Sequence, residues 1–148
     1  MRDVLIAGGG IGGLATALAL GRVGTTSQLI EQADAFTEVG AGIGLGPNAV
    51  RRLQSWGVWE ALQAKGFVPS QLEVMDAKTG QQLGCLPMAK AFEQRYGAPY
   101  LTIHRADLHQ VLLNAVQTEE KTQLHLGHRM HMRDRASANR RRGAGGSG

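Results

Sequence analysis

A glycine-rich stretch directly after a short apolar run constrains the fold of this chain more than any other feature. Residues Val4–Ala7 have the length and β-branched content of a buried parallel strand. Five glycines follow within residues 8–13, three of them in G-x-G-x-x-G spacing at Gly8, Gly10 and Gly13. We expect Gly8 to permit a tight turn out of the strand, Gly10 to let a pyrophosphate approach the backbone, and Gly13 to let the next helix pack closely on the sheet.

The residues after the glycines complete a strand–helix–strand unit. Apolar residues recur at helical spacing over residues 11–22, and a second apolar run, 28–30, ends in Glu31. The N–H groups near Ile11 and Gly12, at the positive end of the helix, are predicted to bind phosphate. Glu31, about twenty residues further on, can accept a hydrogen bond from a ribose hydroxyl. The alternative is a buried βαβ unit with a coincidental glycine turn, but the whole pattern favours an α/β, Rossmann-like FAD- or NAD(P)-binding fold with a parallel sheet.

The charge distribution argues against a nucleic-acid partner. The 148 residues, about one domain, carry a net charge of +4. Residues 1–127 hold ten Lys/Arg and eleven Asp/Glu, whereas residues 128–148 hold six arginines and one aspartate. The basic character therefore belongs to the end of the chain, where no aromatic residues interleave with the arginines.

Cysteine usage and the apolar runs predict a cytoplasmic protein. A single cysteine, Cys85, rules out an internal disulfide and fits a reducing compartment. We expect it to be a small buried side chain. The uncharged run from Val4 to Gly21 is rich in glycine and has no basic residues of a leader before it, so we expect neither a membrane span nor a signal peptide.

A second glycine cluster lies beyond Glu31. Residues 33–47 are expected to form a loop in which Ala, Ile and Leu alternate with Gly over residues 40–47, as in backbone laid against a flat ligand. A helix is predicted over Asn48–Trp56 and ends at Gly57. Residues 58–62 add a helical turn or two.

The remaining pattern predicts a hairpin, a helix and a third strand. Strands at 72–77 and 81–86 flank a turn, as at the start of an inserted β-rich second domain over about 70–103. An extended piece and a helix with an apolar face follow at 100–116. We expect Val4–Ala7, Gln28–Glu31 and Gln123–Leu126 to form one parallel sheet with the first strand central and a right-handed crossover.

These residues resemble a known family, the flavin-dependent aromatic hydroxylases, single-component monooxygenases that use FAD and NAD(P)H. The glycine fingerprint alone fits many FAD or NAD proteins. Further stretches that are similar to the family's flavin loop, its following helix and a later motif are Glu38–Ala49, Leu53–Val58, Arg95–Tyr100 and His104–His109. The later motif is most similar to the 3-hydroxybenzoate 6-hydroxylase and salicylate hydroxylase branch.

The resemblance implies FAD as the bound cofactor and NAD(P)H as co-substrate. By it, Glu31 holds the adenosine ribose, Gly42 and Ile43 line the isoalloxazine with backbone, and Arg105 faces the ribityl–pyrophosphate region. The alternative for Arg105 is a surface ion pair with an acid such as Asp107. The implied reaction is hydroxylation of a small phenolic or benzoate-type aromatic substrate with O2, and the cofactor carries the hard step. No residue of this chain is assigned a catalytic role.

The end of the chain departs from the family pattern. The family's later Asp-Gly and Gly-Asp stretches are absent, and residues 128–148 lack periodicity, so we predict an incomplete FAD-binding domain over 1–127 and a disordered basic tail over 128–148. Three histidines recur at every third residue from His125, but they have no fourth ligand and predict no metal site. We expect a truncated or frame-shifted product that holds FAD weakly and does not hydroxylate aromatics by itself. The alternatives are another FAD- or NAD-linked oxidoreductase and an inactive nucleotide-binding remnant; the oligomeric state stays open.

Overall fold

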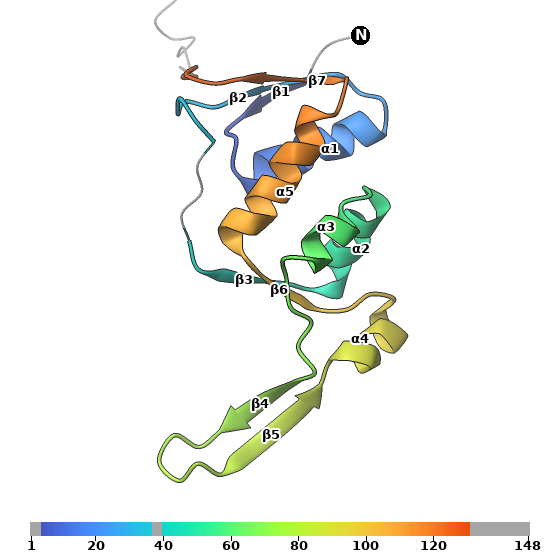
Figure 1. Ribbon diagram of the computed structural model, residues 1–148, viewed down its shortest axis with the longest axis vertical. Helices are drawn as coiled ribbons and strands as arrows, with labels where there is room; N and C mark the ends of the chain where they lie inside the picture. The colour runs from blue at the N-terminus through green and yellow to red at the C-terminus, as the bar shows by residue number, and fades with distance from the viewer. Residues whose placement is uncertain (1–3, 37–39, 131–148) are drawn as a thin grey trace, which may run out of the picture.

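The computed structural model describes residues 4–36 and 40–130. Figure 1 shows a sheet with helices beneath it, a second small sheet further down, and a hairpin that extends from the body. The elements in chain order are β1 (Val4–Ala7), α1 (Ile11–Arg22), β2 (Ser27–Ile30), β3 (Gly42–Leu45), α2 (Pro47–Ser55), α3 (Trp59–Gln63), β4 (Gln71–Met75), β5 (Gln82–Pro87), α4 (Ala89–Tyr96), β6 (Leu101–His104), α5 (Arg105–Gln117) and β7 (Thr122–His125).

The main sheet is parallel and has the order β1-β2-β7. Ile6, Leu29 and Leu124 lie side by side across its three strands. The predicted α/β class and the predicted parallel sheet of these three strands are confirmed. The prediction that the first strand is central is wrong among the described strands, because β1 and β7 pair with opposite edges of β2. Helix α1 connects β1 to β2, and α5 leads into β7, which leaves β2 in the middle.

Helices α1 and α5 cover one face of this sheet and pack against each other (Figure 1). Their spacing of small and large apolar residues explains the contact, because Ala17 and the neighbouring leucines Leu14 and Leu18 are fully buried. From α5, Leu108 and Leu112 enter the same core. This packing fixes the start of α5 relative to the glycine stretch.

A second, two-stranded antiparallel sheet joins β3 to β6. Ile43 pairs with Ile103, and Gly42 pairs with His104, the residue before α5. The expectation that residues 33–47 are all loop is therefore wrong for 42–45. Glycine is depleted in strands, so the local composition concealed a strand whose pairing partner lies about sixty residues further along the chain.

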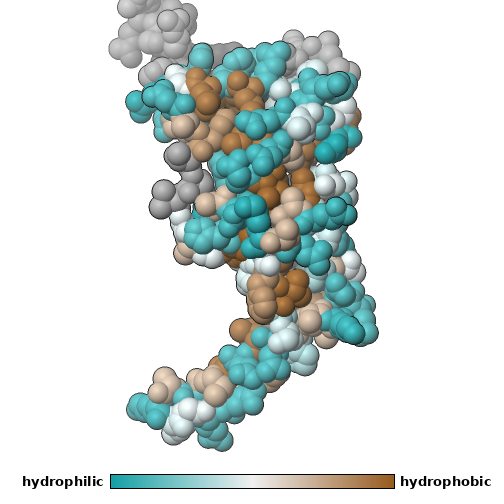
Figure 2. Space-filling model, in the orientation of Figure 1, coloured by the Kyte–Doolittle hydropathy of each residue, from teal (hydrophilic) through white to brown (hydrophobic). Residues whose placement is uncertain are grey.

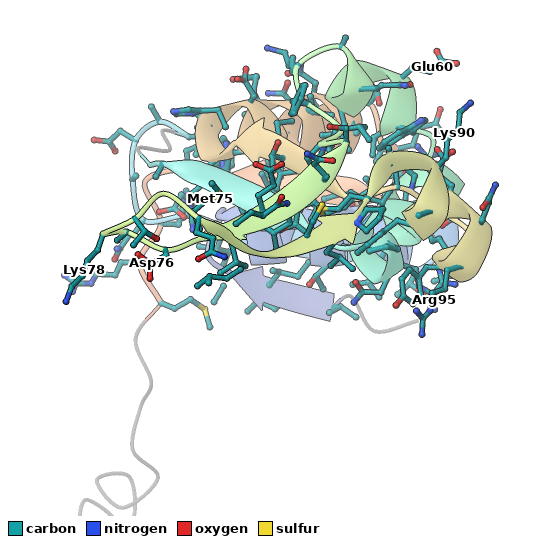
Figure 3. The ribbon with its side chains drawn as sticks, turned by 90° about the horizontal axis from the view of Figure 1, so that it is seen from below. Glu60, Met75, Asp76, Lys78, Lys90 and Arg95 are labelled. Atoms are coloured by element: carbon teal, nitrogen blue, oxygen red, sulfur yellow. The ribbon has the colours of Figure 1, made fainter. Side chains whose placement is uncertain are left out.

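The hairpin β4–β5 extends away from the body, as predicted for a hairpin at this point (Figure 2). Its tip is a turn in which the Asp76 carboxylate accepts hydrogen bonds from the N–H groups of Lys78 and Thr79, and Figure 3 shows Met75, Asp76 and Lys78 together there. Cys85, expected to be buried, is exposed on β5 because nothing in the described chain packs over the hairpin at that point. That the hairpin begins an inserted domain stays a prediction.

The last described residues follow β7 along the end of β2. The N–H of His128 donates to the Glu31 carbonyl at 3.0 Å, and the N–H of Gly127 donates to the Ala33 carbonyl at 3.1 Å. Residues 131–148, most of the predicted disordered tail, lie outside the described residues. Over the described part of the chain, every helix is too short or too polar to cross a bilayer.

Candidate functional site

The glycine stretch forms a tight connection between β1 and α1. Gly8 has φ +103°, which residues with a side chain rarely adopt, so the predicted turn is present. Its N–H donates to the Ile30 carbonyl at 2.7 Å. A Cβ on Gly13 would lie 1.9 Å from the Gly8 carbonyl oxygen, so only glycine permits this approach of α1 to the turn. Both predicted structural roles are met.

The N-terminus of α1 faces open space. Gly10 is the N-cap, and the N–H of Leu14 donates to its carbonyl at 3.0 Å to close the first turn. The N–H groups of Ile11, Gly12 and Gly13 consequently have no acceptor within the helix. A Cβ at Gly10 or Gly12 would meet nothing within 4 Å, and the first turn has no acidic residue. The geometry and the helix dipole both suit an anion at this position.

Glu31 lies directly after β2 and is hydrogen-bonded to the glycine stretch. Its Oε2 accepts the N–H of Gly9 at 2.6 Å, and its Oε1 accepts the N–H of Ala33 at 2.9 Å. The N–H donors of Ala33 and Gly9 hold the pKa of this carboxyl below its ordinary value of 4.5, so it is ionised at neutral pH. Each carboxylate oxygen has a further lone pair with which it can accept a hydroxyl.

Two side chains that the sequence analysis gave no role lie beside the glycine stretch. The Nε2 atom of His109 on α5 is 2.8 Å from the carbonyl oxygen of Gly9, and the ring of Phe36 lies 6.3 Å from the His109 ring. A Cβ on Gly9 would lie 2.2 Å from Cε1 of Phe36. The contact joins residues 100 positions apart in the sequence. The one sequence signal for it was a polar residue, His109, in a helix with a largely apolar pattern.

Two cavities open on this arrangement. The larger has a volume of about 400 Å³ at the carboxyl ends of β1 and β2 and is lined by Ala7, Gly8, Ile30, Glu31, Gln32, His128, Arg129 and Met130. The smaller, about 160 Å³, is lined by Gly9, Gly10, Glu31, Ala33, Ala35, Phe36 and His109. The carboxyl ends of parallel strands are where open α/β sheets bind their ligands.

Arg105, Gly42 and Ile43 meet at the junction of the small sheet with α5. The pairing of β3 with β6 places Gly42 and Ile43 beside the strand that leads into Arg105, whose N–H donates to the Ala41 carbonyl at 3.2 Å. A Cβ on Gly40 would lie 2.8 Å from Cδ of Arg105, so the arginine side chain runs along this glycine.

Asp107, the acid named in the alternative for Arg105, pairs with another residue. Its Oδ1 lies 2.7 Å from Nζ of Lys65, and this hydrogen bond lowers the pKa of Asp107. The ion pair that Asp107 forms is therefore with Lys65, which argues against the alternative that Arg105 pairs with Asp107.

Helix α5 connects the two groups of predicted site residues. Arg105 and His109 are one turn apart on it and so share a face, and His109 contacts Gly9. The structure thus brings the glycine stretch, Glu31 and His109 of α5 together. Gly42 and Ile43 are joined to α5 through the pairing of β3 with β6, the strand that leads into it. Among the described residues, no group of three or more His, Cys, Asp or Glu side chains is placed to hold a metal ion.

Comparison with known proteins shows which family the chain belongs to. A family model described as "FAD binding domain" matches residues 1–147. The chain belongs to the FAD-binding domain family. The predicted family, fold class and FAD cofactor are confirmed, and the glycine stretch is the part of this FAD-binding domain that the fold places at the strand ends.

Relatives of this FAD-binding domain are named as hydroxylases and monooxygenases. The 3-hydroxybenzoate 6-hydroxylase of Polaromonas naphthalenivorans is 44% identical over 120 residues, which are 81% of this chain and 30% of that protein. The 6-hydroxynicotinate 3-monooxygenase of Bordetella bronchiseptica is 36% identical over 113 residues, which are 76% of this chain and 30% of that protein. The crystal structure of PqsL from Pseudomonas aeruginosa matches with TM-score 0.74 and 25% identity over 90% of this chain and 36% of PqsL. The chain thus spans about 30% of the length of its curated relatives.

Proposed function

We propose that this chain binds the adenosine and pyrophosphate portion of FAD and contributes one edge of the flavin site of an aromatic-ring monooxygenase. The observation that carries the proposal is the open N-terminus of α1 beside the ionised Glu31. The N–H groups at the N-terminus of α1 can donate to an anion, and the Glu31 carboxylate can accept hydrogen bonds from hydroxyl groups. These two features lie at the ends of adjacent parallel strands and match a pyrophosphate linked to a ribose.

Each predicted site residue has a role in this proposal. The N–H groups of Ile11 and Gly12 donate to the pyrophosphate, which the absence of a side chain at Gly10 allows to approach. The free lone pairs of Glu31 accept the adenosine ribose hydroxyls. These contacts are the adenosine side of the site.

The flavin side of the proposed site comes from the small sheet and α5. Gly42 is exposed on β3, so its backbone is open to a flat ring system, and Ile43 lies beside it. Arg105 supplies a permanent cation toward the ribityl–pyrophosphate chain. His109 links this helix to the glycine stretch and so relates the two sides.

The names of the relatives support hydroxylation of a small aromatic acid as the activity of the whole protein. FAD, when bound, supplies electron transfer from NAD(P)H and activation of O2. The residues described in this chain bind and orient the cofactor, and none of them is assigned a catalytic role. A reducing cytoplasmic location fits a lone cysteine that is exposed.

The binding proposal is tested by titrating FAD into the 148-residue chain and following flavin fluorescence. ADP, which carries the adenosine and pyrophosphate groups, should displace FAD, whereas riboflavin, which carries neither, should displace it poorly. Displacement by riboflavin alone would contradict the assignment of the adenosine side.

A substitution at the N-cap of α1 sharpens this test. Gly10→Asp places a carboxylate where the anion is proposed to bind, and aspartate is a favourable N-cap. We expect the thermal midpoint to hold or rise while FAD binding is lost. Gly84→Asp, in the hairpin where an added Cβ also meets nothing within 4 Å, is the matched control and should bind FAD normally.

The activity is tested by supplying FAD, NADH or NADPH and 3-hydroxybenzoate or salicylate to the purified chain. We expect flavin binding without hydroxylated product, because the residues described here are proposed to bind only the cofactor. Product formed in step with nicotinamide oxidation would assign the whole reaction to these 148 residues.

A further inference from the structure

The backbone of Gly9 is held on both sides, through its N–H and through its carbonyl, by residues distant in sequence. Its N–H donates to Oε2 of Glu31 at 2.6 Å, and its carbonyl lies 2.8 Å from Nε2 of His109. Glu31 follows β2 in the main sheet, and His109 is in the second turn of α5. The middle of the glycine stretch is thus tied to the sheet on one side and to the covering helix on the other.

The bond to His109 has a defined direction. A carbonyl oxygen only accepts hydrogen bonds, so Nε2 of His109 must carry the proton and donate. His109 is 3% exposed and is, with Ser27, one of two buried polar side chains in the described chain. A buried imidazole without a partner is costly, so this bond holds both the ring and the Gly9 carbonyl in place.

We propose that His109 is a positioning residue for cofactor binding, which acts with Glu31 to hold the backbone of Gly9 so that the N-terminus of α1 is oriented for the pyrophosphate before FAD arrives. This inference rests on the proposed function of the glycine stretch. It assigns Gly9 a role different from that of its neighbours, because its N–H is already used by Glu31 while those of Ile11 and Gly12 stay available.

The arrangement also excludes any residue with a side chain at the position of Gly9. Phe36 lies where a Cβ on this residue would project, so the loop is confined by the Phe36 ring as well as by the two hydrogen bonds. Because His109 shares a helix face with Arg105, the same contact relates the proposed flavin-side cation to the pyrophosphate loop.

The first test compares FAD affinity of two His109 variants. His109→Gln retains an N–H donor near the position of Nε2, whereas His109→Leu removes the donor at similar volume. We expect His109→Leu to weaken FAD binding about fivefold, as for loss of one buried hydrogen bond, and His109→Gln to recover most of that affinity. Equal losses in both variants, or no loss in His109→Leu, would overturn the proposal.

A control separates positioning from general packing. Val116→Ala removes buried volume two turns further along α5, away from the glycine stretch. It should lower the thermal midpoint and leave FAD affinity unchanged. A loss of affinity equal to that of His109→Leu would show that only helix packing matters, and the positioning role would be rejected.

A second readout needs no cofactor. The amide of Gly9 should exchange with deuterium faster in His109→Leu than in the wild type or in His109→Gln, measured by NMR without FAD. If the wild type fails to bind FAD, the proposed function of this chain is refuted. The exchange data still decide whether His109 and Glu31 hold the backbone of Gly9. Unchanged Gly9 exchange in His109→Leu overturns the inference even if FAD binds.

Discussion

Glu31 and Gly9 are 22 residues apart in the sequence and 2.6 Å apart in the structure, where Oε2 of Glu31 accepts the Gly9 N–H. The same carboxylate accepts the Ala33 N–H through its other oxygen. A residue predicted only to bind a ribose therefore also holds the glycine stretch and the chain after β2. Its loss should affect the protein even without a cofactor.

The stability contributed by Glu31 should depend on pH. Backbone N–H donors lower its pKa below 4.5 in the folded state, so its stabilising effect is complete above that value and is lost as the pH falls through the folded-state pKa. Glu31→Gln should cost about 1 kcal/mol at pH 7, and the difference from the wild type should shrink toward pH 3. Urea denaturation of both proteins at several pH values measures this. A difference that stays constant down to pH 3 would contradict the assignment.

Two glycines one position apart should respond oppositely to alanine. Gly13→Ala puts a Cβ against the Gly8 carbonyl and should destabilise the fold by about 1–3 kcal/mol. Gly12→Ala meets no atom within 4 Å and should be neutral or stabilise α1 by up to about 1 kcal/mol. Thermal unfolding of the two variants without FAD tests the contrast. Similar midpoints for both would show that α1 does not pack on the turn as described.

Arg105→Ala should weaken FAD retention more than Arg95→Ala. Arg105 begins α5 beside Gly40, whereas Arg95 is in the last turn of α4 with its guanidinium over the Tyr96 ring, where Figure 3 shows it at the outer side of the molecule. A lost cation–phosphate contact should cost about tenfold in affinity. Flavin occupancy of the two purified variants gives the comparison, and equal occupancy would count against the role proposed for Arg105.

The apolar face of the hairpin should contribute little to stability and much to association. Leu72, Val74 and Leu86 are each about half exposed on paired positions of β4 and β5. The double change Leu72→Thr and Val74→Thr should alter stability by less than about 0.5 kcal/mol per site and reduce light scattering at high protein concentration. Leu101→Thr, at a fully buried position of β6, is the contrasting control and should cost at least about 2 kcal/mol. A double variant as unstable as this control would show that the hairpin face is packed.

Much of the candidate site was predictable because its signals are local. The turn at Gly8 needs a positive φ, the approach at Gly13 needs a missing Cβ, and the acid after the second strand falls at a set distance from both. Such requirements act within a few residues or one βαβ unit, so residue types and spacing reveal them. The hairpin was predicted for the same reason, since its turn residues and alternating strands lie together in the chain.

The tertiary structure decided what depends on segments far apart. Whether β2 or β1 is central depends on which edge of the sheet β7 joins, and no local pattern specifies that edge. The glycine-rich β3 is a strand because β6 offers it backbone partners about sixty residues later. His109 meets Gly9 only because α5 packs on α1 across 100 residues. The sequence alone determined the nucleotide-binding unit, because that unit depends on conformational requirements of single residues. The strand order, the β3–β6 pairing and the two hydrogen bonds to Gly9 were decided by the packing of separate elements. The free energy of that packing is shared among many side chains that are distant in sequence, so no single stretch of sequence predicts it.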